Sequence, residues 1–165
     1  MTRPNRKTTR LPGFDYSTEG AYFLTICTEN RKCLLSHITR ESPVHEPKTE
    51  LLPYGRIAEH YIRQLSDFYE ELQVKAFVIM PNHIHILLFV TKGPSGTPVP
   101  TLQNSTVSRF ISTLKRFCNK EIGRNIWQYR SYDHIIRDQE DFRKHLQYIQ
   151  ENPFGWEKDV FYSAE

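Results

Sequence analysis

The sequence has no long hydrophobic run and few cysteines. Its longest mostly apolar stretch, residues 84–90, has seven residues including His85, whereas a membrane-spanning helix needs roughly 20. The N-terminus has no apolar core like that of a signal peptide. Cys27, Cys33 and Cys118 form no Cys-x-x-Cys pair, which argues against a disulfide framework or a cysteine zinc site. We therefore expect a cytoplasmic protein with no membrane partner, whose reduced thiols fill small core positions.

The net charge is also low, at +3, and by itself it is a weak argument for a nucleic-acid partner. Its distribution is uneven, because residues 1–10 contain no acid and four basic residues, Arg3, Arg6, Lys7 and Arg10. Subtracting these four charges from +3 leaves −1 for the rest of the chain. A second acid-free stretch, residues 101–120, contains Arg109, Lys115, Arg116 and Lys120. Such local fields attract a phosphate backbone, although a solubilising tail and a solvated helix face would look the same.

The length of 165 residues, with 38% hydrophobic content, is enough for one substantial core and too short for two independent enzymatic domains. We expect a basic N-terminal tail at residues 1–20, a single domain at 21–156 and a C-terminal tail at 157–165.

The first half of the domain predicts three strands and one helix. Aromatic and β-branched residues at 21–28 favour a buried strand. A polar stretch follows, with a short hairpin arm expected around residues 32–37. From Pro53 the apolar residues recur every three or four positions, which predicts a helix. Two apolar runs, 74–80 and 83–90, flank Pro81-Asn82 and predict an antiparallel hairpin.

The second half predicts a loop, two helices and a last strand. Residues 91–105, with three prolines and two glycines, form the loop. An amphipathic helix begins near Val107, a short strand covers 132–137, and Asp138 caps a third helix that ends near Asn152, before Pro153. This order is that of an α+β, ferredoxin-like βαββαβ antiparallel sheet with helices on one face, plus a C-terminal helix. Proteins with this fold have many different functions, so the fold alone does not indicate the function of this chain.

His83 and His85 are the first candidate site residues. Strand alternation sends both side chains to one face and Ile84 to the other. Neutral imidazole is a common metal ligand, and two of them on a rigid strand have a fixed separation. Histidines satisfied only by hydrogen bonds are the alternative. The rest of the strand is apolar, so burying both side chains is costly unless something partners them.

The third helix offers a second group of polar side chains. Its apolar stripe is Phe142, Leu146 and Ile149, and Tyr148 lies about one helical step off that stripe. Asn152, four residues on, lies over the same face and can offer a carbonyl oxygen to a metal. His145, three residues back, lies there too. Tyr148 as a packing residue is the alternative interpretation.

Several separated motifs resemble those of one known family. They are the first strand at 21–25, the run 78–85 that contains Pro81-Asn82-His83-Ile84-His85, the segments 126–128 and 132–137, and Tyr148-Ile149-Gln150-Glu151-Asn152-Pro153. In this combination, over residues 21–156, the sequence resembles the single-tyrosine HUH transposases, in the branch associated with repetitive extragenic palindromes (REPs).

The resemblance implies a reaction on single-stranded DNA in which a tyrosine oxygen attacks a backbone phosphate and leaves a 5′-phosphotyrosine link and a free 3′ hydroxyl. It makes Tyr148 the nucleophile and His83, His85 and Asn152 the metal ligands. Mg²⁺ or Mn²⁺ is the expected ion. Because a free tyrosine has a pKa near 10, Tyr148 needs help to lose its proton, from the metal environment or from His145.

The implied partner is single-stranded DNA that forms a hairpin. Arg109, Lys115, Arg116 and Arg137 are candidate contacts to its backbone, and Arg3 and Arg6 in the tail are further candidates. The site forms either within one chain or across a homodimer, and the sequence leaves both open.

Two other functions fit parts of this pattern. A ferredoxin-like nucleic-acid binding protein without catalysis, such as a domesticated transposase, would use sheet-face aromatics for stacking, but the strands look buried on both faces and no RNP-type motif is present. A metal-dependent hydrolase that activates water would leave Tyr148 structural.

Overall fold

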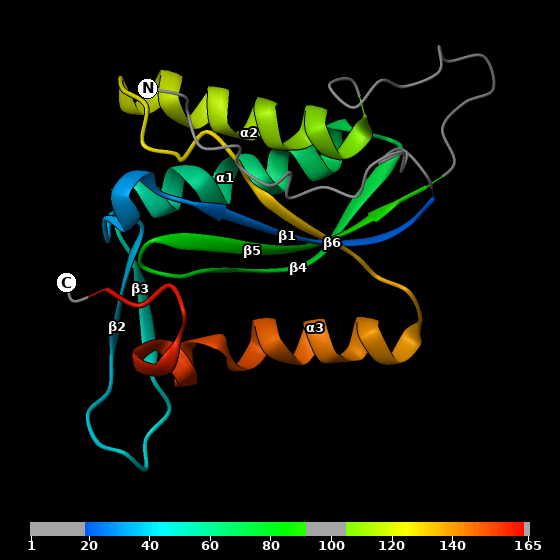
Figure 1. The fold of residues 1–165 in the computed structure, drawn as a ribbon. Coiled ribbons are helices and arrows are strands. Elements are labelled where there is room, and N and C mark those ends of the chain that lie inside the picture. Colours follow the sequence, from blue (N-terminus) through cyan, green and yellow to red (C-terminus); the bar gives the residue numbers. More distant parts are fainter. Residues whose placement is uncertain (1–18, 92–104, 164–165) are drawn as a thin grey trace, which may run out of the picture.

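The computed structural model describes residues 19–91 and 105–163. A four-stranded antiparallel sheet forms the centre of the molecule, with the strand order β4-β5-β1-β6. These strands are β1 (Gly20–Cys27), β4 (Leu72–Ile79), β5 (His83–Val90) and β6 (Tyr132–Ile135). Helices α1 (Pro53–Phe68) and α2 (Thr106–Ile122) cover one face, and α3 (Gln139–Glu151) crosses the opposite face (Figure 1). The predicted ferredoxin-like fold with an added C-terminal helix is confirmed.

The two faces of the sheet separate the apolar core from the candidate site. On β1, Tyr22, Leu24 and Ile26 join the main core with α1 and α2, together with Ile84 and Ile86 of β5. A smaller cluster on the α3 side contains Phe23, Leu87 and Ile149. Alternation along β5 therefore sends His83 and His85 to the face that α3 covers.

Local signals in the sequence explain where the helices begin and end. Pro53 occupies the first turn of α1, where its missing N–H removes no hydrogen bond. The Ser105 side chain accepts from Ser108 N to cap α2, which ends at Gly123 with φ 86°. Asp138 caps α3 by accepting from Asp141 N at 2.8 Å, as the sequence predicted. Asn152 follows the last residue of α3.

A separate hairpin lies between β1 and α1. Its strands are β2 (Ser36–Thr39) and β3 (Lys48–Leu51), paired antiparallel, so the hairpin is farther along the chain than residues 32–37. The strands are short and half-polar, and in such strands the register depends on the turn rather than on a hydrophobic pattern. The hairpin is anchored to α1, because Leu52 N donates to Leu35 O at 2.9 Å.

The C-terminal segment packs against the sheet. A short 3-10 helix, η2 (Asn152–Lys158), continues from α3. Residues 159–163 then run to the start of β5, beside η1 (Glu29–Arg31) (Figure 1). The predicted tail at 157–165 thus contributes contacts to the domain over its described part. The expected basic tail and most of the loop 91–105 lie outside the described residues. Within the described ranges, no helix is both long enough and apolar enough to cross a membrane.

Candidate metal and tyrosine site

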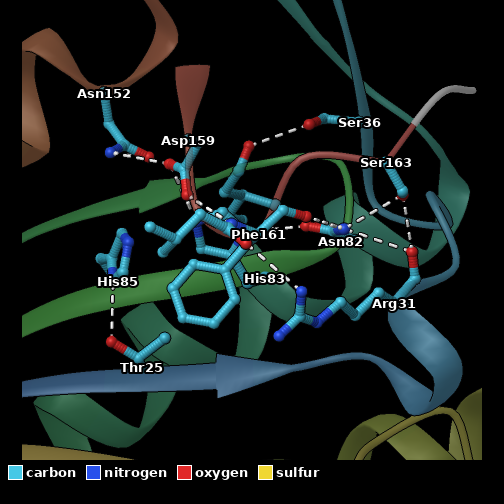
Figure 2. Close-up of polar contacts among 12 residues, drawn as sticks. Thr25, Arg31, Ser36, Asn82, His83, His85, Asn152, Asp159, Phe161 and Ser163 are labelled. Atoms are coloured by element: carbon cyan, nitrogen blue, oxygen red, sulfur yellow. Dashed lines mark hydrogen bonds and ion pairs between the residues drawn. The ribbon is translucent and has the colours of Figure 1, made fainter. Parts of the chain in front are cut away.

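His83 and His85 lie side by side, buried under α3. Their ring centroids are 4.6 Å apart, and neither side chain is appreciably exposed. Figure 2 shows both imidazoles on β5, with the C-terminal segment above them. The predicted common orientation of the two rings is therefore present in the fold.

The protonation of His83 is determined by its neighbour Asn82. The Asn82 amide nitrogen donates to the backbone oxygens of Phe161 at 2.7 Å and Arg31 at 3.2 Å. Its side-chain oxygen must then accept, and it lies 2.8 Å from His83 Nδ1. His83 accordingly carries its proton on Nδ1 and has a lone pair on Nε2. Thr25 Oγ1 lies 2.9 Å from Nδ1 of His85 and orients that ring through a hydrogen bond in which either atom can be the donor.

Both histidines are neutral near pH 7. Burial lowers the pKa of His83 from 6.5 to about 4, and the Asn152 side chain opposes this shift. Burial, reinforced by the neighbouring His83, lowers the pKa of His85 to about 3. A neutral imidazole with one nitrogen held by a hydrogen bond is the form in which histidine binds a metal.

Three buried acceptor atoms converge here without a hydrogen-bond partner in the described parts of the chain. They are Nε2 of His83, Nε2 of His85 and Oδ1 of Asn152. Asn152 donates its amide to Asp159 Oδ2 at 3.4 Å (Figure 2), which leaves its oxygen for another group. Unpartnered buried polar atoms are costly, so this set fits a divalent cation that accepts imidazole and amide-oxygen ligands.

Tyr148 lies at the open edge of the same site. Its ring packs edge-on against His85 at a centroid distance of 5.2 Å and against Phe23 at 6.0 Å. The side chain is 41% exposed, so an external substrate can reach it. Partial burial raises the pKa of Tyr148, the Asp159 carboxylate adds to this, and the Asn152 side chain opposes it. In the protein alone Tyr148 is therefore a weaker acid than free tyrosine.

His145 faces a second polar cluster beside Tyr148. Its Nδ1 lies 2.8 Å from Asp141 O and 3.1 Å from Asp141 Oδ1, so it donates there and its Nε2 carries the lone pair. Asp141 also accepts from Nε2 of His134 at 2.9 Å, and the two imidazoles stack at 4.6 Å. Phe23 packs against His145 at 4.6 Å. His134, which had no chemical role in the sequence analysis, thus positions the acid that holds His145.

Asp159 is the site residue that the sequence analysis missed. Its side chain is 3% exposed, and Oδ2 lies 3.9 Å from His83 Nε2. One ligand atom from each of His83, His85 and Asp159 lies within 4.8 Å of the others. Asp159 follows a 3-10 helix in an irregular segment, so it belongs to no helical or strand pattern of apolar residues. The sequence around it also contains no cluster of Asp or His residues that would have indicated a metal site.

Solved structures and curated sequences place the chain among known proteins. No family model matches the sequence. The fold is similar to the solved structure of a REP-associated tyrosine transposase bound to a REP hairpin, with a TM-score of 0.60, 21% identity and coverage of 89% of this chain and 73% of that one. An uncharacterized protein of Haemophilus influenzae is 31% identical over 96% of this chain and 93% of its own. The REP-associated tyrosine transposase of Escherichia coli is 27% identical over 88% of this chain and 74% of its own.

The chain belongs to the REP-associated tyrosine transposase family. Membership agrees with the resemblance found in the sequence motifs, which spanned most of the domain. Family membership makes transposition the function to test in this chain.

The candidate basic residues that the structure describes are spread over three places. Lys115 and Arg116 line a groove at one end of α2, and Arg31 and Arg130 line it with them. Arg109 pairs with Glu71, so its charge is largely offset. Arg137 lies in a smaller groove with Lys144, beside His134. Arg3 and Arg6 are outside the described residues.

The α2 groove also contains aromatic side chains that the sequence analysis did not single out. Tyr129 is 96% exposed, and it lines the groove together with Tyr132. Lys115 donates to Gln128 O at 2.8 Å and so holds the segment that carries Tyr129 against α2. Burial lowers the pKa of the Lys115 ammonium to about 8. The dipeptide Tyr129-Arg130, an aromatic residue next to a cationic one, could have indicated a surface that binds single-stranded nucleic acid.

Proposed function

We propose that this transposase family member cuts and rejoins single-stranded DNA at hairpin-forming palindromes through a covalent link to Tyr148. The observation that carries the proposal is the position of Tyr148, exposed at the edge of a site where three buried ligand atoms converge. That a solved transposase of this fold is described as bound to a REP hairpin supports a hairpin as the substrate.

Tyr148 acts as the nucleophile in this proposal. Its oxygen forms a bond to the scissile phosphorus, the bond to the 3′ oxygen breaks, and the products are a 5′-phosphotyrosine and a 3′ hydroxyl. A covalent intermediate keeps the broken ester available for rejoining. The raised pKa of Tyr148 means that the hydroxyl needs a proton acceptor. His145 is the candidate, because Asp141 engages Nδ1 and orients the ring three residues before Tyr148.

His83, His85 and Asn152 would hold Mg²⁺ or Mn²⁺. Both histidines are neutral and pre-oriented by Asn82 and Thr25, so no proton has to leave when the ion binds near neutral pH. When bound by these residues, a divalent ion would polarise a phosphate oxygen and offset the charge that develops during attack. The protein itself supplies a dry, fixed ligand set on the rigid strand β5.

The DNA backbone follows the α2 groove in this proposal. Arg116 and Lys115 supply charge, and exposed Tyr129 supplies a surface on which a base can stack. Arg137, Arg3 and Arg6 remain proposed backbone contacts. The Tyr148 and His85 rings meet within one chain, so the proposed site is complete without a second copy.

A covalent-adduct assay tests the proposal. The protein is incubated with Mg²⁺ or Mn²⁺ and labelled single-stranded hairpin oligonucleotides copied from the DNA flanking its own gene, and products are separated on a denaturing gel. We expect an adduct that Tyr148→Phe and His83→Ala abolish. Tyr162→Phe is the matched control, because Tyr162 is 44% exposed, close to the 41% of Tyr148.

Three other outcomes would contradict this assignment. An adduct that survives Tyr148→Phe would mean that another residue is the nucleophile. Cleavage without any adduct, unaffected by Tyr148→Phe, would indicate hydrolysis by an activated water. Hairpin binding with neither adduct nor cleavage under either ion would favour a non-catalytic, domesticated binding protein.

A further inference from the structure

The C-terminal segment 159–163 is fixed over the two histidines by several independent contacts. Asn82 donates to Phe161 O at 2.7 Å, Arg31 donates to Val160 O at 3.3 Å, and Ser163 Oγ donates to Arg31 O at 3.0 Å. The Phe161 ring lies 4.7 Å from the His83 ring. These contacts, drawn in part in Figure 2, give the residues of this segment defined positions beside the site.

Asp159 enters the site from this segment and is deeply buried. Its Oδ1 accepts from Phe161 N at 2.9 Å, which fixes the rotation of the side chain. Its Oδ2 accepts from the Asn152 amide at 3.4 Å and faces His83 Nε2 at 3.9 Å. The carboxylate is thus aimed at the same space as the three unpartnered acceptor atoms.

The pairing between Asp159 and His83 is not an ordinary ion pair. Because the Asn82 side-chain oxygen requires the His83 proton on Nδ1, the Nε2 atom presents a lone pair to the carboxylate. Two electron-rich atoms then face each other in a buried space, an arrangement that is unfavourable unless a cation lies between them. Within the described chain, the ion-pair contact of Asp159 is with His83 alone. The Arg31 guanidinium lies instead over the Phe161 ring, at 5.5 Å.

We infer that Asp159 is a fourth protein ligand of the metal, adding a carboxylate to His83, His85 and Asn152. The inference rests on the metal site of the proposed function and deepens it. A hard, negatively charged oxygen increases affinity for Mg²⁺ and Mn²⁺. It also couples metal binding to the position of the C-terminal segment, because the ligand belongs to that segment.

Direct metal binding tests this inference without DNA. Mn²⁺ affinity is measured by calorimetry and by the electron paramagnetic resonance signal of free Mn²⁺, on the full chain and its variants. Asp159→Asn keeps the size of the side chain but removes its negative charge and one of its two acceptor oxygens, and we expect about tenfold weaker binding or more. Glu157→Gln, an exposed acid two residues away, removes the same charge and should bind like the unmodified chain. His83→Ala should lose binding.

Unchanged Mn²⁺ affinity in Asp159→Asn, with loss in His83→Ala, would overturn the Asp159 assignment and leave the proposed function intact. Absence of Mn²⁺ binding by the unmodified chain would overturn the assignment together with the metal part of the proposed function. Loss of the tyrosine adduct alone, with metal affinities as expected, would contradict the proposed function and leave this inference standing.

A second measurement covers the case in which Asp159→Asn fails to fold. In the unmodified chain, hydrogen exchange of the backbone amides at residues 160–163 is followed with and without Mn²⁺. Ligation through Asp159 should slow their exchange by about tenfold. The same exchange rates with and without Mn²⁺, at a concentration that saturates the site, would overturn the inference.

Discussion

The two histidines of β5 are neutral because burial leaves their rings almost no access to water. Single polar neighbours orient the two rings: Asn82 contacts His83, and Thr25 contacts His85. The sequence predicted the pair and its common face from alternation alone. It could not predict which nitrogen carries the proton, because that depends on Phe161 O and Arg31 O, which orient the Asn82 amide.

Acid should destabilise the metal-free protein through these histidines. Their pKa values in the folded state, about 4 and about 3, are lower than the ordinary 6.5, so between these limits the unfolded chain binds more protons. Stability is therefore complete above pH 6.5 and falls as the pH decreases toward 4. The slope for each histidine is about 1.4 kcal/mol per pH unit.

Urea unfolding in the presence of a chelator, at pH 7, 6 and 5, measures this slope. His85→Gln should reduce the loss of stability between pH 6 and pH 5 by about half, because one of the two histidines is removed. A free energy of unfolding that stays constant from pH 7 to pH 5 would show that the rings are not buried as neutral groups.

Among the elements, the helices and the main sheet were predictable, and the irregular segments were not. Hydrophobic periodicity marks α1, α2 and the strands because each has one face in the core. The hairpin of β2 and β3 and the segment 159–163 bury few apolar residues, so their positions depend on individual hydrogen bonds. Asp159 was therefore not among the predicted site residues, whereas His83, His85, Asn152 and Tyr148 were.

The junction between α1 and the hairpin should be sensitive to one added methyl group. A Cβ at Gly55 would lie 2.0 Å from Leu35 O, a backbone atom. Gly55→Ala therefore forces the helix and the hairpin apart, and we expect a loss of about 3 kcal/mol of stability. Gly155→Ala, where a Cβ would meet nothing within 4 Å, is the matched control and should be nearly neutral. Equal melting temperatures for the two variants would contradict the observed packing.

Across the whole molecule, the low net charge gives no indication that basic residues gather in the α2 groove. The described basic residues that line the α2 groove include Arg116, whereas Arg109 on the same helix is neutralised by Glu71. The sequence analysis could not separate these two arginines, because Glu71 comes from the turn before β4, far away along the chain.

Salt dependence of single-stranded DNA binding distinguishes the two arginines. Arg116→Ala should weaken binding and reduce the slope of log K against log salt by about 1. Arg109→Ala should change the slope much less, because its guanidinium is already paired. Fluorescence anisotropy at several salt concentrations measures both slopes. A larger change for Arg109→Ala would place the DNA path elsewhere.

Tyr129 should contribute to binding without contributing to the salt slope. Stacking of one base on its exposed ring is expected to be worth about 1–3 kcal/mol, so Tyr129→Ala weakens binding at every salt concentration by a constant factor. Tyr129→Phe keeps the ring and should bind normally. Weakening by Tyr129→Phe as strong as that by Tyr129→Ala would mean that the hydroxyl, and not the ring, is used.

The pairing of β1 with β5 brings Thr25 opposite His85 and Cys27 opposite His83. A shift of this register by one residue would turn every side chain of β1 to the other face of the sheet, so Thr25 would leave His85 and Phe23 would leave Tyr148. The same register error that disrupts the core would therefore remove the Thr25 contact to His85 and the Phe23 contact to Tyr148. The DNA cleavage that we propose would thus depend on complete folding, because a chain with the wrong register would lack the assembled site.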